Sequence, residues 1–117
     1  MDIILHRLIY AELLFILQLG RNLVLYELGR PSEAVAYFRA LVSKYPNFAD
    51  GQAALAVMLY AQGSTSQEVT DGWETAVEQD SRYVDVEWVR DIRRWPPALV
   101  TSLEAFKKSD LYSSIVF

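Results

Sequence analysis

Apolar and small residues recur at helical spacing along most of the chain, which predicts helices rather than strands. The pattern also repeats itself once. A leucine, a glycine, a small or apolar residue and a large aromatic follow one another in two stretches, first 34 and then 35 residues apart. One extra residue after Gly63 accounts for the change. The matched pairs are Leu25 and Leu59, Gly29 and Gly63, Ala34 and Val69, Phe38 and Trp73, Leu41 and Ala76, and Pro46 and Ser81.

Each stretch predicts two helices joined by a short turn. Gly29 and Gly63 can take the left-handed conformation that ends a helix. In the first copy Ser32, after a proline, is suited to cap the second helix, and Pro46 is suited to end it. The small and aromatic positions are suited to a close, buried contact between helices. The alternative is two ordinary antiparallel helix pairs whose similarity is accidental.

Residues 15–83 resemble the tetratricopeptide repeat family, whose units are helix–turn–helix pairs of about 34 residues. The resemblance implies an all-α fold, a short right-handed α-solenoid of antiparallel helix pairs that binds other proteins. Arg21, Asn22 and Ser81 depart from the family pattern. We divide the single domain into an apolar N-terminal helix (1–14), repeat 1 (15–48), repeat 2 (49–83), capping helices (84–108) and a tail (109–117).

The C-terminal third predicts two further helices that would cap the last repeat. The first covers residues 84–95, and the prolines Pro96 and Pro97 end it. Pro97 is suited to the first turn of a second helix, from Ala98 to about Lys108. The expected stripe of the first helix is Val84, Trp88, Ile92 and Trp95, and that of the second is Leu99, Leu103 and Phe106.

The end of the chain carries a second resemblance. The run Arg93-Arg94-Trp95-Pro96-Pro97 is similar to the RRWPP-type tail of tetratricopeptide proteins of plastids and cyanobacteria, over residues 46–107. That resemblance implies a place at the thylakoid, as an accessory or assembly factor of the photosynthetic machinery. The other residues that carry it are Trp73, Ala76, Asp80, Arg82, Tyr83, Asp85, Trp88, Leu99 and Phe106.

The N-terminal segment, residues 3–28, is largely apolar. His6 and Glu12 interrupt it, so it offers no apolar run of about 18 residues that would span a membrane. It also lacks the basic start and cleavage site of a signal peptide. A helix that is apolar on nearly every side needs cover on nearly every side. Either it caps the first repeat, or it docks through Leu13 and Leu17 onto a membrane protein or the membrane surface.

In the tetratricopeptide family the first helix of each repeat lines a concave, ligand-binding face. Family members that grip a terminal carboxylate carry lysines and asparagines where this chain has Ala53 and Val57, so that clamp is missing. The groove would be apolar and suited to a helix or an extended apolar peptide. The alternative is that the N-terminal helix of the chain fills it. The mapped groove residues are Leu23, Tyr26, Asp50, Ala53, Val57 and Tyr60.

The composition leaves little for catalysis. The chain has no cysteine and only one histidine, His6, so it has no thiol nucleophile and no zinc–thiolate site. Glu74 and Glu78 lie one turn apart, on a predicted solvent face with no nucleophile or ligand set beside them. We therefore expect no catalytic, cofactor-binding or metal-binding residues, and no enzyme.

Negative charge is concentrated in residues 64–91, where eight acids face two bases, Arg82 and Arg90. Such a segment repels phosphates, so we expect no nucleic-acid partner. It is either a solvated outer helix face or a surface for a basic partner.

These observations predict a non-catalytic protein–protein interaction scaffold. The first hypothesis is an accessory or assembly subunit of a thylakoid membrane complex, of photosystem type. It would be associated with the membrane peripherally or through its protein partner. The second hypothesis is a soluble, cytoplasmic, chaperone-type adaptor that binds transient peptides. A permanent subunit would co-purify with its partner in stoichiometric amount, whereas an adaptor would be monomeric alone.

Overall fold

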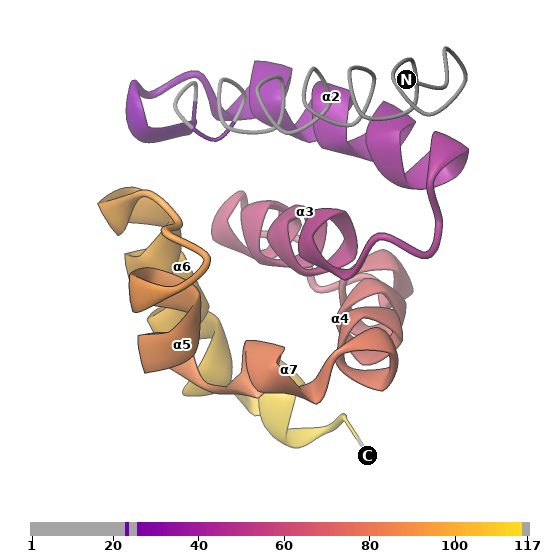
Figure 1. Cartoon of the computed structure of the whole chain (residues 1–117), viewed down its shortest axis with the longest axis vertical. Helices are drawn as coiled ribbons and strands as arrows, with labels where there is room; N and C mark the ends of the chain where they lie inside the picture. The colour runs from indigo at the N-terminus through magenta and orange to yellow at the C-terminus, as the bar shows by residue number, and fades with distance from the viewer. Residues whose placement is uncertain (1–22, 24–25, 116–117) are drawn as a thin grey trace, which may run out of the picture.

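The fold is all-α. The computed structural model describes residue 23 and residues 26–115, and within them every regular element is helical, with no strand (Figure 1). The predicted N-terminal helix, residues 1–14, lies outside the described residues. The elements are α2 (Pro31–Lys44), α3 (Ala49–Ala61), α4 (Gln67–Gln79), a 3₁₀ helix (Ser81–Val84), α5 (Val86–Asp91), α6 (Pro97–Lys107) and α7 (Asp110–Ser113).

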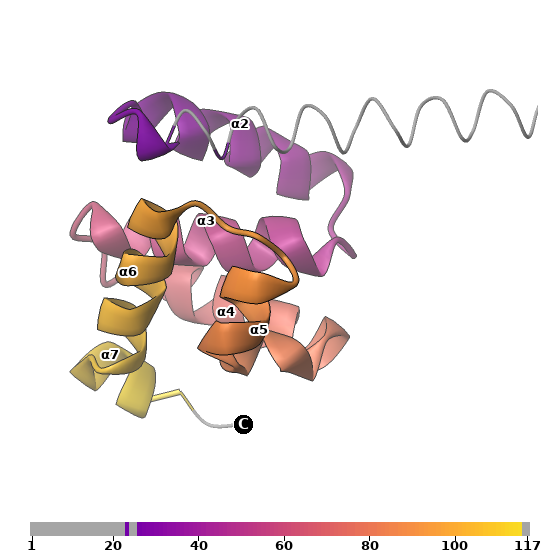
Figure 2. The ribbon, with the colours of Figure 1, turned by 60° about the vertical axis from the view of Figure 1, so that its left-hand side comes forward.

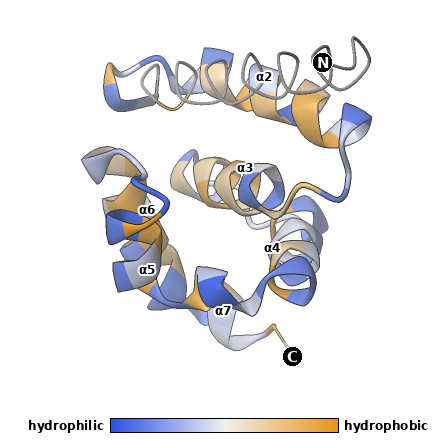
Figure 3. Ribbon diagram, in the orientation of Figure 1, coloured by the Kyte–Doolittle hydropathy of each residue, from blue (hydrophilic) through white to orange (hydrophobic). Residues whose placement is uncertain are grey.

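Helix α3 lies at the centre of the molecule. Figures 1 and 2 show α2 along one side of it, with α4 and α6 on the others, and α3 contacts all three. Its sequence explains the position, because small and apolar residues surround the helix on every side and such a helix must be covered on every side. Figure 3 shows this as hydrophobic colour along most of α3, whereas α4 is largely polar on its outer side.

The helix ends follow the predicted glycines. Gly29 and Gly63 have positive φ angles of 79° and 94°, as the left-handed end of a helix requires. The start of α2 differs from the prediction that Ser32 caps it. Pro31 is the first helical residue and Arg30 precedes it. Proline suits that position because its fixed φ is already helical and it has no N–H group to satisfy.

The small and aromatic positions of the repeat lie in the core. Ala34, Phe38, Val69, Trp73 and Ala76 are all fully buried. The prediction that these positions mediate helix contacts is therefore confirmed. Consecutive helices α2, α3 and α4 also pack neighbour on neighbour, which a solenoid requires. The right-handed tetratricopeptide stack itself stays a prediction.

The first capping helix is shorter than predicted. Asp85 caps α5 by accepting hydrogen bonds from the N–H groups of Glu87 and Trp88, which makes Val86 its first residue. The helix ends at Asp91, and the predicted stripe is wrong at Ile92, which is 65% exposed. Val89 is the buried residue of α5 instead.

The second capping helix agrees with the prediction. Helix α6 begins at Pro97 and ends at Lys107, and Leu99, Leu103 and Phe106 are fully buried. After it, the described part of the tail forms the short helix α7, which Ser109 caps through the N–H of Tyr112. None of the helices in the described ranges is long and apolar enough to cross a membrane.

Trp73 joins α4 to the C-terminal helices. Its ring lies edge-on to Phe106, with centroids 5.3 Å apart, and 6.1 Å from the ring of Tyr112. We expect Trp73→Ala to lower the free energy of unfolding by about 3–5 kcal/mol, because it removes a fully buried aromatic and leaves a cavity. Chemical denaturation measures this. Trp88→Ala is the control, because Trp88 is only half-buried; equal losses for both variants would contradict the central role of Trp73.

Candidate functional site

The predicted groove is not open to a partner in this structure. Asp50, Ala53 and Val57 are buried, two of them completely. In the folded chain these three residues therefore offer no surface to a partner, and their contact with one stays a prediction. Leu23 is also buried, whereas Tyr26 and Tyr60 keep partly exposed side chains.

Helix α6 and the loop before it cover the predicted groove face. Tyr60 of α3 packs on Phe106 of α6, with ring centroids 5.2 Å apart. Tyr26 shares a 2.9 Å hydrogen bond with Ser102. The C-terminal segment thus takes the place that the sequence assigned to a peptide or to the N-terminal helix.

A buried carboxylate anchors this cover. Asp50 lies in the first turn of α3, where the positive end of the helix dipole stabilises a negative charge. Its Oδ1 atom accepts three hydrogen bonds: the hydroxyl of Tyr83 donates at 2.6 Å, the Nε of Arg93 at 3.2 Å and the indole N–H of Trp95 at 3.2 Å. We call these four residues the Asp50 cluster. It joins α3 to the 3₁₀ helix and to the α5–α6 loop.

An unusual backbone conformation brings Arg93 and Trp95 to the same oxygen. Arg94, between them, has a φ of 56°, in the left-handed region that residues other than glycine rarely adopt. The N–H of Trp95 then donates to the carbonyl of Val89 at 3.4 Å, which turns the chain back along α5. Pro96 follows, and Pro97 begins α6.

The donors of the Asp50 cluster hold their protons tightly. Burial, together with the charge and hydrogen bond of Asp50, raises the pKa of the Tyr83 hydroxyl well above its ordinary value. Burial lowers the pKa of the Arg93 guanidinium, but the charges and hydrogen bonds of Asp50 and Tyr83 together outweigh that effect, so this pKa is raised above its ordinary value. Neither group is deprotonated near neutral pH, so both act as constant donors in a structural network.

Aromatic packing extends the cluster to the surface. The rings of Tyr83 and Trp88 meet edge-on, with centroids 5.0 Å apart. The guanidinium of Arg82 lies 4.7 Å from the centroid of the Trp88 ring, and it also pairs with Asp80 at 2.7 Å. Several residues of the RRWPP-type resemblance, such as Tyr83, Trp88 and Trp95, therefore have a structural role in this chain.

Sequence reasoning missed the Asp50 cluster. It assigned Asp50 to the groove and gave Arg93 no contact at all. One signal was present: Asp50 is the only charged residue in the otherwise small and apolar segment 49–61. A carboxylate in a helix that must be buried on every side needs donors, because burying a charge without partners is costly.

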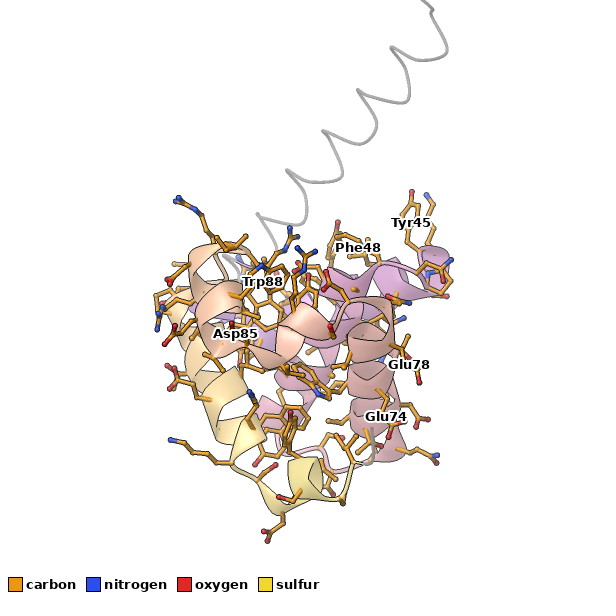
Figure 4. All side chains as sticks on the ribbon, turned by 60° about the horizontal axis from the view of Figure 1, so that its bottom comes forward. Tyr45, Phe48, Glu74, Glu78, Asp85 and Trp88 are labelled. Atoms are coloured by element: carbon orange, nitrogen blue, oxygen red, sulfur yellow. The ribbon has the colours of Figure 1, made fainter. Side chains whose placement is uncertain are left out.

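The acidic segment lies mainly on the surface. Arg39 holds Glu68 through two hydrogen bonds of 2.8 and 3.0 Å, and these lower the pKa of the Glu68 carboxyl. Arg90 pairs with Asp91 at 2.9 Å. Figure 4 shows Glu74 and Glu78 pointing outward from α4. This arrangement agrees with the solvated outer face that was one of the two interpretations.

One shallow groove remains open beside the covered face. It lies between the C-terminal end of α3 and the outer side of α6, with a volume of about 500 Å³. The groove is lined by Tyr60, Ala61, Gly63, Thr65, Thr101, Ser102 and Ala105.

Within the part of the chain that the structure describes, no three histidine, cysteine, aspartate or glutamate side chains gather as a metal site would require. The remaining residues singled out in the sequence, Leu13, Leu17 and His6, lie outside the described residues.

Comparison with known proteins identifies no relative of this chain. No protein-family model, no curated protein and no solved structure matches this chain. The class of the protein is therefore given by its architecture alone: a small all-α protein in which the C-terminal helices cover the inner face of the central helix.

The Asp50 cluster makes a direct prediction. Asp50→Ala removes the acceptor and leaves three buried or half-buried donors without it, so we expect the free energy of unfolding to fall by about 3 kcal/mol. Asp91→Ala removes an exposed carboxylate paired with Arg90, and we expect the unfolding midpoint to stay that of the natural chain. Urea denaturation compares the two, and similar midpoints would show that the buried cluster contributes no more than the surface pair.

Proposed function

We propose that this protein is a non-catalytic protein-binding scaffold, an accessory or assembly subunit of a thylakoid membrane complex. It docks on a membrane-protein partner through its N-terminal segment, with Leu13 and Leu17 as contacts. The resemblance to tetratricopeptide proteins of plastids supports the location. The covered inner face of α3 is the observation that carries the proposal.

The covered face favours a permanent subunit over a peptide-binding adaptor. An adaptor of this family needs an open concave surface, but here Ala53 and Val57 have no exposed surface. Opening the face would expose Leu99, Leu103 and Phe106, and burying such side chains stabilises a fold by about 1.5–3 kcal/mol each. Their exposure would cost as much as a small domain's whole stability. Binding by displacement of α6 is therefore disfavoured.

We place the partner contact in the N-terminal segment because its sequence is largely apolar. Of the described residues at its C-terminal end, Leu23 is buried and Glu27 accepts a 2.7 Å hydrogen bond from the N–H of Ala98, at the start of α6. The acids of residues 64–91 support the exclusion of nucleic acid as a partner.

The chaperone-type adaptor remains as a second candidate on one observation. The open groove beside Tyr60 and Ser102 holds about 500 Å³, which is the size of a small binding site. A short apolar peptide would fit there without displacing α6. Titration of a fluorescent apolar peptide measures its affinity for the natural chain and for Ala105→Arg, whose long side chain would block the groove. A loss of affinity in the variant would favour this candidate over the first.

Leu13→Asp tests the docking hypothesis. We expect the variant to keep its cooperative unfolding and to lose co-purification with the membrane complex from mild-detergent thylakoid extracts. A buried aspartate without partners disfavours association by several kcal/mol. Mass spectrometry of the co-eluting proteins, with stoichiometry, measures the loss.

The matched control is Leu28→Asp. Leu28 is the last residue of the segment, away in sequence from Leu13 and Leu17, and it is 70% exposed, so its replacement should leave co-purification unchanged. If Leu13→Asp unfolds the chain, the N-terminal segment belongs to the core and the docking hypothesis is wrong. If both variants keep the partner, the partner binds elsewhere.

A further inference from the structure

The loop between α5 and α6 is a short, strained hinge. It covers residues 92–96, and its central residue, Arg94, has the left-handed φ of 56°. For an L-residue with a side chain this conformation is unfavourable, because Cβ comes close to the backbone carbonyl. Pro96 adds a second constraint, since the residue before a proline prefers an extended backbone.

The part of the chain after the hinge packs on distant segments. We call residues 97–113, which form α6 and α7, the C-terminal arm. Its buried residues Leu99, Leu103 and Phe106 have no exposed surface, and α6 makes more contacts with α3 than with α5. The face that receives the arm is thus formed by residues far earlier in the sequence. An identical face exists on every other copy of the chain.

The Asp50 cluster holds the hinge closed. Arg93 and Trp95, on either side of Arg94, both donate to Oδ1 of Asp50. These two bonds fix the residues that flank the strained one. With them in place, the arm returns to the α3 helix of its own chain. Without them, the strain at Arg94 is opposed within the hinge only by backbone hydrogen bonds to α5, such as that from the N–H of Trp95 to the carbonyl of Val89, among the described contacts.

We propose that the Asp50 cluster keeps the arm in its own chain, and that breaking the cluster causes two copies to exchange their arms. An exchanged dimer retains every contact between arm and α3, because each arm meets the same face on the other copy. It also relieves the strain at two hinges, and strained short hinges favour exchange of this kind. The exchange is independent of the membrane partner.

The test variant carries Arg93→Met and Trp95→Phe together. Both replacements keep apolar bulk and remove the two donors, while the bond from Tyr83 to Asp50 stays. We expect the association constant for dimerisation to rise at least about tenfold over the natural chain, since two strained residues are relieved. Light scattering coupled to size-exclusion chromatography, over a range of concentrations, measures it. Adding Arg94→Gly, which removes the strain, should restore the monomer.

A cross-link shows whether the arms have exchanged. The natural chain has no cysteine, so Ala61→Cys in one chain and Ala105→Cys in another provide two unique sites. Both residues are exposed and line the same groove, one from α3 and one from α6. A short bifunctional maleimide should join the two chains only when the arm of one lies on α3 of the other.

Three results would overturn the proposal. The Arg93→Met, Trp95→Phe variant could remain monomeric at every concentration. It could form dimers that the maleimide does not join, which would be surface association. If the variant fails to unfold cooperatively, Arg93→Met alone serves instead, because that side chain is 37% exposed and its loss is mild. A monomeric Arg93→Met variant would then also count against the exchange.

Discussion

The need to cover α3 on every side determines the rest of this structure. A helix of small and apolar residues is stable in water only if other elements surround it, and here α2, α4 and α6 do so. One charge lies within it, the Asp50 carboxylate, and it needs donors for the same reason that the helix needs cover. Tyr83, Arg93 and Trp95 supply these hydrogen bonds, so the segments that cover the helix also provide the donors for its charge.

The consequence for function is that a surface suited to binding has become part of the core. In a helical repeat array the inner face is open and takes ligands, whereas in this chain α6 packs on the face of α3 that was predicted to form a groove. The small size of the chain explains this, because a small domain needs most of its apolar surface for stability. Binding then passes to segments outside the covered face, which is why we place it at the N-terminal segment.

The need to cover α3 also explains the residues of the RRWPP-type tail. Arg93 and Trp95 donate to Asp50, Arg94 provides the reversal between them, and Pro97 begins the helix that covers α3. These residues therefore have structural roles in closing the C-terminal helices onto α3. A shared architecture with the plastid proteins that they resemble, and the place at the thylakoid, are proposals that rest on that resemblance.

The local features of the fold were determined by the sequence itself. Periodicity located α2, α3, α4 and α6, the glycines ended helices, and the aromatic positions Phe38 and Trp73 entered the core, because each depends on neighbours within one or two helical turns. The covered groove and the Asp50 cluster were decided only by the tertiary structure. Their partners are 33, 43 and 45 residues from Asp50, and the contact depends on the backbone angle of a single residue, Arg94. Spacing along a chain carries no information about such angles, so the face that looked open in the sequence is closed in the fold.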